Sequence, residues 1–166
     1  MFRKSNESDF DSIYKIINSA AIAYKGIIPA DRWKEPYMPE DELAGEIAAG
    51  VIFWCWEEAG DIIGVMGIQD VKDVTLIRHA YTHPTCQRKG IGSKLLKHLI
   101  AKTQRPLLIG TWADAKWAVQ FYEKQGFNMV TDEEKNILLR KYWNIPERQV
   151  ETSVVLSNTQ VAKLLS

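Results

Sequence analysis

Residues 87–92 read Gln87-Arg88-Lys89-Gly90-Ile91-Gly92, and they lie between an apolar, strand-like segment and a segment with helical spacing of apolar residues. Glycine lets the backbone turn tightly here and approach a ligand closely. The first N–H groups of a helix have no partners within it, and the helix dipole favours anions at that end. Arg88 and Lys89 add positive charge beside these groups. The segment therefore predicts a cradle for a phosphate or pyrophosphate group.

Two common phosphate-binding motifs fit this segment poorly. It lacks the Gly-Lys-Ser/Thr ending of a P-loop. It also lacks the third glycine of the dinucleotide fingerprint, and the region about 20 positions further on offers Gln104 and Thr111 in place of an acidic residue. A plain strand-to-helix turn with solvated basic residues stays open, because a short glycine pattern alone is weak evidence.

A second pattern follows along the chain. Residues 118–127 predict a helix that carries Phe121 and Tyr122 on one face and ends at Gly126. Taken alone, such a pattern more often marks a pair of buried core aromatics than a site.

The two patterns occur in a particular order, with a helix and the apolar strand Pro106–Trp112 between them. This arrangement, over about residues 74–130, resembles the GNAT superfamily of N-acetyltransferases. The resemblance implies that segment 87–92 binds the pyrophosphate of acetyl-CoA. It also implies that Tyr81 and Thr82 offer backbone groups to the pantetheine arm, and that Tyr122 lies by the thioester sulfur as the general acid.

The spacing of apolar residues predicts the remaining elements. Helices are expected from the N-cap Ser8 to Gly26, from about Pro39 to Gly50, from the N-cap Asp114 to Gly126 and over 133–143, with strands over 2–4, 51–57, 62–69, 74–82, 127–130 and 149–156. Hairpins come first and strand–helix–strand units follow. This order indicates one α+β domain over residues 1–166, with a mixed, mostly antiparallel, twisted sheet flanked by helices.

The general base is left unassigned by the sequence. Some family members carry a glutamate at the position that we align with Leu76, and many carry an asparagine where this chain has Ala115. His79 is a candidate base, because a histidine pKa near 6.5 suits proton transfer; a half-buried structural histidine is the commoner case. Period-2 alternation predicts that His79 and Tyr81 share one face of their strand, and that Arg78 and Leu76 share the other.

Residues 26–39 lie where the family shapes its acceptor pocket, and three prolines indicate a loop. Trp33 and Tyr37 are candidate walls of that pocket. Asp31 and Glu35 are candidates to hold an ammonium group. A solvated lid with its aromatic residues packed against the core is an equally good interpretation.

Composition excludes several classes of protein. Lys and Arg together number 21, as do Asp and Glu, so the formal net charge is zero. This argues against a nucleic-acid partner, since that binding relies on clustered positive charge. A helix that spans a bilayer needs about 20 apolar residues, and no apolar run in the chain approaches that length. The first ten residues contain no apolar stretch of the kind found in a signal peptide. Cys55 and Cys86 form no metal-type spacing, so a reduced, cytoplasmic protein without a metal is expected.

The sequence thus predicts an enzyme that moves the acetyl group of acetyl-CoA to a primary amine by direct attack. The alternatives are a non-catalytic acyl-CoA-binding sensor or interaction module, which would not need Tyr122, and a nucleotide-phosphate binder of another fold. The acceptor stays open among polyamines, amino acids, aminoglycosides, protein lysines and protein N-termini. A homodimer also stays open, with residues 132–156 as a candidate docking segment.

Overall fold

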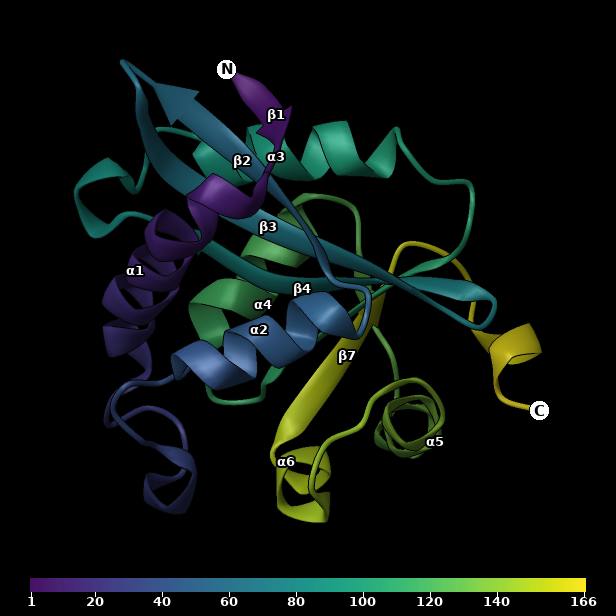
Figure 1. The fold of residues 1–166 in the computed structure, drawn as a ribbon. Helices are drawn as coiled ribbons and strands as arrows, with labels where there is room; N and C mark the ends of the chain where they lie inside the picture. The colour runs from purple at the N-terminus through teal and green to yellow at the C-terminus, as the bar shows by residue number, and fades with distance from the viewer.

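The computed structural model describes residues 1–166, which form one seven-stranded sheet flanked by helices (Figure 1). The strands are β1 (Phe2–Lys4), β2 (Ile52–Glu58), β3 (Asp61–Val71), β4 (Val74–Thr82), β5 (Leu107–Trp112), β6 (Asn128–Met129) and β7 (Ser153–Ser157). They lie in the order β1-β2-β3-β4-β5-β7-β6. Strands β4 and β5 are parallel and all other neighbours are antiparallel. The mixed, mostly antiparallel sheet predicted from the sequence is confirmed.

Helices cover both faces of this sheet. They are α1 (Phe10–Ala21), α2 (Glu40–Ala48), α3 (Ile91–Ile100), α4 (Lys116–Lys124), α5 (Asp132–Tyr142) and α6 (Glu147–Glu151). Successive residues of β4 show which helices cover which face. Ile77 packs in one cluster with Leu95 of α3 and Tyr122 of α4, whereas Leu76 packs in another with Leu138 of α5. Helices α1 and α2 lie on the same face as α5, over β2 and β3.

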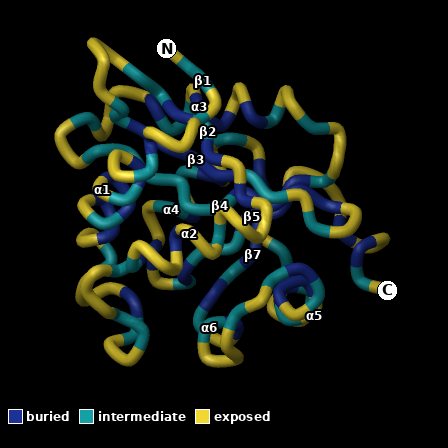
Figure 2. Tube along the Cα trace, in the orientation of Figure 1, coloured by how far each residue is buried: buried dark blue, intermediate teal, exposed yellow.

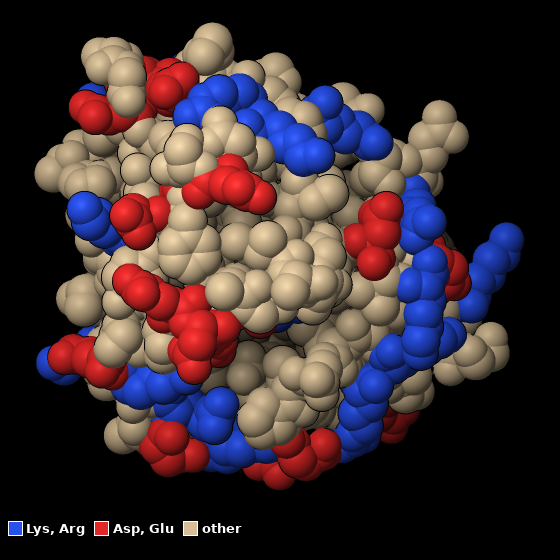
Figure 3. Space-filling model, viewed as in Figure 1, with Lys and Arg blue, Asp and Glu red and all other residues tan.

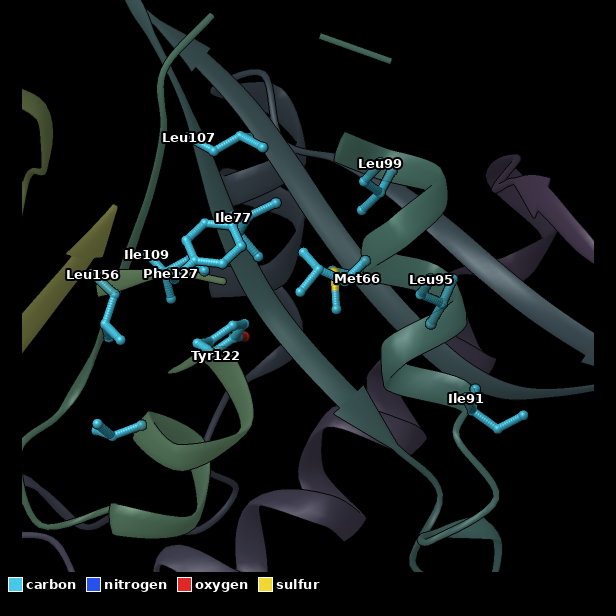
Figure 4. Packing of buried hydrophobic residues seen from close by; sticks show 12 residues of the cluster. Met66, Ile77, Ile91, Leu95, Leu99, Leu107, Ile109, Tyr122, Phe127 and Leu156 are labelled. Carbon is cyan, nitrogen blue, oxygen red and sulfur yellow. The ribbon is translucent and has the colours of Figure 1, made fainter. Parts of the chain in front are cut away.

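Buried residues lie along the central strands and on the adjoining helices (Figure 2), and their side chains form clusters on both faces of the sheet. Figure 4 shows the layer under α3 and α4, where Met66 and Ile77 from the strands meet Leu95 and Tyr122 from the helices. On the opposite face, α5 covers β4, β5 and β7, and α1 and α2 pack on β2, β3 and the second half of β4. The strands at the centre of the sheet are therefore held from both sides.

Strand β4 carries a bulge that positions the site. Gly67 of β3 pairs with Arg78, and the next pair along β4 involves Tyr81, so two steps of β3 oppose three steps of β4. Within the bulge, His79 has a φ of +55°. The bulge interrupts the alternation of side chains between the two faces of the sheet. The side chains of Arg78 and His79 therefore both reach Glu46 of α2. The prediction that Arg78 and His79 lie on opposite faces is therefore wrong.

Two predicted N-caps are also wrong. The first helical segment is capped by Asn6, which forms a capping box with Asp9, and not by Ser8. The N-cap of α4 is Ala115, without a side-chain hydrogen bond, and Asp114 precedes it in a turn. In both cases the sequence offers a suitable capping side chain near the helix start, but the helix begins after a different residue close to it.

The chain between β6 and β7 holds two helices. The predicted strand over 149–156 starts later, since Glu147–Glu151 form α6 and β7 begins at Ser153. Strands β6 and β7 still pair with each other, so α5 and α6 are an insertion between two neighbouring strands. This insertion packs on the face that α1 and α2 also cover.

Candidate active site

A cavity opens where β4 and β5 separate. The ladder between these strands ends at the pair Ile77–Ile109, so the β4 edge over residues 78–82 that faces β5 has no strand partner. The cavity has a volume of about 780 Å³, and its wall extends from Gly92 at the start of α3 to Trp143 just after α5. These two helices lie on opposite faces of the sheet, so the cavity passes through the gap between the strands.

The turn before α3 forms one end of the cavity. Arg88 (φ +72°) and Gly90 (φ +74°) both adopt the left-handed conformation, and Gly90 is the N-cap of α3. No side chain caps the first N–H groups of the helix. These N–H groups stay available to a ligand, and successive turn N–H groups of this kind bind anions. The guanidinium of Arg88, on the cavity wall, adds positive charge.

Most of the predicted site residues lie on the wall of this one cavity, namely Tyr37, Tyr81, Thr82, Gln87, Arg88, Gly90, Ile91, Gly92 and Tyr122. Two do not reach it, Lys89 and Trp33. Trp33 stacks behind Tyr37, with ring centroids 5.7 Å apart, and so supports the wall. Gly92 has a packing role too, because a Cβ there would lie 3.3 Å from the ring of Phe121 on α4.

Tyr122 projects from α4 toward the gap between β4 and β5 (Figure 4). Its ring packs edge-on against Phe121 and Phe127, with centroids 5.1 and 6.1 Å away. Burial raises the pKa of the Tyr122 hydroxyl above its ordinary value of 10, and the neighbouring Tyr24 raises it further. The phenol is therefore protonated at neutral pH and can donate its proton to a group in the cavity.

Aromatic side chains line the cavity on the side of α1. Tyr24, just after α1, stacks on Trp117 of α4 with centroids 5.6 Å apart and lies 5.7 Å from the ring of Tyr37. The hydroxyl of Tyr37 accepts a hydrogen bond of 2.9 Å from Nε1 of Trp112. Neither Tyr24 nor Trp117 stands out as a site residue in the sequence. Their place in the wall depends on contacts between distant segments.

The two carboxylates proposed to hold an ammonium group have other partners. Asp31 accepts hydrogen bonds of 3.0 and 3.3 Å from the guanidinium of Arg148 on α6. Glu35 pairs with Lys25 at 3.1 Å. Neither carboxylate lines the cavity, and no other Asp or Glu does so. The interpretation of Asp31 and Glu35 as ammonium ligands finds no support in this arrangement.

Helix α5 shapes the opposite wall, which sequence reasoning missed. Leu139 and Trp143 line the cavity, and Gly110 of β5 leaves room for Trp143, since a Cβ there would lie 3.2 Å from the indole. Leu76 is fully buried beneath α5. A glutamate at that position would be buried among leucine side chains, so the apolar residue fits its surroundings.

A polar group lies on the α2 side of the bulge. Arg78 donates hydrogen bonds to Gln69 (2.9 Å) and Glu46 (3.3 Å). Nε2 of His79 lies 3.6 Å from Oε2 of Glu46, has no hydrogen-bond partner and is shielded from solvent. Burial lowers the pKa of His79 below its ordinary value, and Glu46 opposes part of that shift. Both Arg78 and His79 reach the cavity wall. Both belong to the unpaired edge of β4, over residues 78–82.

The chain offers no other kind of site among those with a recognisable side-chain pattern. No group of three or more His, Cys, Asp or Glu side chains could hold a metal ion. None of the helices has the length and apolar character needed to cross a membrane. Cys55 and Cys86 are both free thiols.

A mixed sheet that opens at its parallel pair, followed by a glycine-containing turn and a helix with uncapped first N–H groups, is the arrangement expected of an acyltransferase that uses an acyl-CoA. The sequence model of the GNAT acetyltransferase domain matches residues 49–129. The peptidyl-lysine N-acetyltransferase YiaC of Escherichia coli K12 is 24% identical over 132 residues, which cover 78% of this chain and 84% of YiaC. Residues 49–129 therefore carry a GNAT acetyltransferase domain, and both matches indicate an acyltransferase enzyme of the GNAT superfamily of N-acetyltransferases.

Solved structures of the same fold contain coenzyme A or acetyl-CoA. The PaiA N-acetyltransferase of Thermoplasma acidophilum, in complex with coenzyme A, has a TM-score of 0.70 and 17% identity, over 96% of this chain and 98% of that one. A GNAT acetyltransferase of Brucella melitensis, in complex with acetyl-CoA, has a TM-score of 0.59 and 19% identity, over 77% of this chain and 82% of that one. These neighbours support acetyl-CoA as the co-substrate of this fold.

Proposed function

We propose that this enzyme transfers the acetyl group of acetyl-CoA to a primary amine by direct attack, with Tyr122 as the general acid. The observation that carries the proposal is the cavity itself. It runs through the gap between β4 and β5, with the anion-binding turn at one end and the Tyr122 hydroxyl on its wall. A long acyl-CoA and a separate amine can therefore meet in the gap from opposite faces of the sheet.

The residues on the α3 side suit acetyl-CoA. The uncapped N–H groups of the turn and the Arg88 guanidinium would hold the pyrophosphate. The unpaired edge of β4 at Tyr81 and Thr82 would hydrogen-bond the amide groups of the pantetheine arm, because an extended chain can add to an open strand edge. Ile91 and Gln87 complete this wall of the cavity.

The reaction needs two proton transfers. An alkylamine has a pKa near 10.4, so most of it is protonated at pH 7 and must lose a proton before it can attack. Backbone N–H groups on the open edge of β4 would stabilise the negative charge that develops on the thioester oxygen. When the carbon–sulfur bond breaks, the sulfur of CoA takes a proton from Tyr122, whose raised pKa keeps the phenol protonated until then.

The wall on the acceptor side favours an amine on an apolar chain. Aromatic rings line it, and it has no carboxylate to bind a second ammonium group, so a polyamine would leave an unpaired charge there. Tyrosine faces attract one alkylammonium group through their electron-rich rings. Figure 3 shows this side, where a hollow between α2 and α6 is bordered mostly by uncharged atoms, with acidic side chains at its edge over α2. The name of YiaC describes it as an enzyme that acts on peptidyl-lysine. A lysine side chain of a peptide is therefore the first acceptor to test.

The first experiment distinguishes loss of co-substrate binding from loss of stability through backbone strain, by comparing two glycine variants. Gly90→Ala and Gly60→Ala both place a Cβ at positive φ (+74° and +86°) with no atom within 4 Å, so both should cost about 1–2 kcal/mol of stability. Only Gly90 lies on the cavity wall. A ligand at a hundredfold excess over its Kd adds about 2.7 kcal/mol of stability, which raises the melting temperature.

CoA should raise the melting temperature of the wild type and of Gly60→Ala equally, and that of Gly90→Ala much less. An unchanged wild-type melting temperature at millimolar CoA would contradict the proposed co-substrate site. Thiol release from acetyl-CoA is then followed with a blocked lysine peptide, spermidine and a free-N-terminus peptide. CoA binding without turnover on any of these amines would favour the non-catalytic binding module.

A further inference from the structure

We infer that His79 is the general base that takes the proton from the acceptor amine, and that Glu46 positions its ring. This inference rests on the proposed acetyl transfer, and it fills the role that Leu76 cannot perform.

The backbone at His79 is held in an unusual conformation. A φ of +55° is uncommon for a residue with a Cβ and carries a free-energy cost. Gly67 across the ladder leaves room for this backbone, because a Cβ there would lie 2.9 Å from the carbonyl oxygen of Arg78. The extra residue of the bulge turns the His79 side chain toward α2 on the cavity wall, although regular alternation would point it to α3. Strain of this kind at a cavity wall is typical of a functional residue.

The acid and the base lie on opposite faces of the sheet. Tyr122 packs in the cluster under α3 and α4, on the side of the turn that would hold pyrophosphate. His79 lies on the other face, where its ring is 6.1 Å from that of Phe53 and its Nε2 approaches Glu46 of α2. Both line the same cavity. The group that protonates the sulfur thus lies on the CoA side, and the group that deprotonates the amine lies on the acceptor side.

The charged groups that face His79 leave it neutral. They are Glu46 and Glu42 on α2, which favour the imidazolium, and Arg78 on β4, which opposes it. Burial outweighs the carboxylates and lowers the pKa of His79, so the imidazole is unprotonated at pH 7. A proton on Nε2, toward the carboxylate of Glu46, leaves the lone pair on Nδ1 for the substrate. Only 14% of the His79 side chain is exposed, and its Nε2 is shielded from solvent. A substrate would therefore have to approach the part of the ring that does not include Nε2.

The proton balance of the step is as follows. The ammonium group of the acceptor gives one proton to His79, which later releases it to solvent. The amine lone pair then forms the carbon–nitrogen bond, and the carbon–sulfur bond breaks with its electron pair on sulfur. The sulfur takes the proton of Tyr122, and the second proton of the nitrogen, lost as the amide forms, returns to the tyrosinate. One amide, one free thiol and one proton result.

The test compares His79→Asn, His79→Gly and His98→Asn. Asparagine and glycine both tolerate positive φ, so the bulge should persist. His98 lies on the exposed side of α3, outside the cavity, and is the matched control. With acetyl-CoA and the most active amine of the panel, both His79 variants should lose at least about a hundredfold in kcat, within the usual range for a general base. Their CoA-induced melting shifts should match the wild type.

Two further readouts distinguish a base from a structural histidine. Imidazole should restore part of the kcat of His79→Gly, in proportion to its neutral form, and have no such effect on His79→Asn. Glu46→Gln removes an interaction that raises the pKa of His79 and leaves Arg78 uncompensated, so the acidic limb of the kcat–pH profile should move to lower pH. A His79→Asn variant with the kcat and the pH profile of the wild type would show that His79 is not the general base, and would leave the proposed acetyl transfer intact. Absence of wild-type turnover on every amine would remove the proposed function, and the base with it.

Discussion

Replacing Tyr122 by phenylalanine removes one hydroxyl group and leaves the buried ring in place. The ring keeps its edge-on contacts with Phe121 and Phe127. No hydrogen bond to the protein contributes to the pKa of this hydroxyl, which burial dominates. The substitution should therefore leave the melting temperature nearly unchanged, because no buried partner loses its hydrogen bond.

The effect on catalysis should be large by comparison. General acids contribute 10²–10⁴-fold, and a thiolate is a weak base that gains only moderately from protonation. We expect kcat to fall about tenfold to a hundredfold, which is about 1.4–2.7 kcal/mol of barrier. The KM for acetyl-CoA should change little, since the hydroxyl acts mainly in the transition state.

The assay is steady-state thiol release at saturating acceptor, with the melting temperature of each variant measured in parallel. Tyr24→Phe is the control, because it also removes a buried tyrosine hydroxyl from the same wall and leaves the residues of α4 unchanged. A kcat of Tyr122→Phe equal to that of the wild type would show that water or another group protonates the sulfur. Tyr122 would then be a packing residue only.

Three further outcomes are expected. Trp33→Ala should raise the acceptor KM and leave acetyl-CoA affinity nearly intact, because Trp33 only supports Tyr37; kinetics with equal losses for both substrates would contradict this. Gly67→Ala should cost about 1–3 kcal/mol of unfolding free energy, since its Cβ would lie within 2.9 Å of two neighbours, whereas Gly45→Ala on α2 has open space and should gain up to about 1 kcal/mol in denaturant titrations. A thiol reagent should label Cys86 in the native protein and Cys55 only after unfolding, because burial raises the pKa of Cys55 to about 12; fast labelling of both would be the contrary result.

Local patterns in the sequence were enough to predict the sheet, most helices and the cavity wall around the turn. The glycines of segment 87–92 and the aromatic face of α4 are local signals. Each is formed by residues that lie close together in the sequence. The bulge at His79 is different, because it depends on Gly67 across the ladder as well as on its own strand. Alternation within β4 could not reveal it.

The acceptor wall was the least predictable part of the site, for a similar reason. Asp31 was a reasonable ammonium ligand from sequence, but its partner is Arg148, which lies 117 positions away along the chain. The position of α5 over Leu76 likewise follows from an insertion between two paired strands. Side chains that meet only through the tertiary fold leave no periodic signal within one segment.

The short ladder between β4 and β5 has a consequence for the mobility of the sheet. The sheet consists of two halves, β1 to β4 and β5 to β7, and only three register pairs join them, from Thr75–Leu107 to Ile77–Ile109. Opening along this seam breaks few backbone hydrogen bonds, so amide protons beside it should exchange with solvent sooner than those within either half. A pantetheine chain lying along the free edge of β4 would act as a substitute strand. Filling the cavity would then slow exchange across the seam and tie the two halves into one cooperative unit.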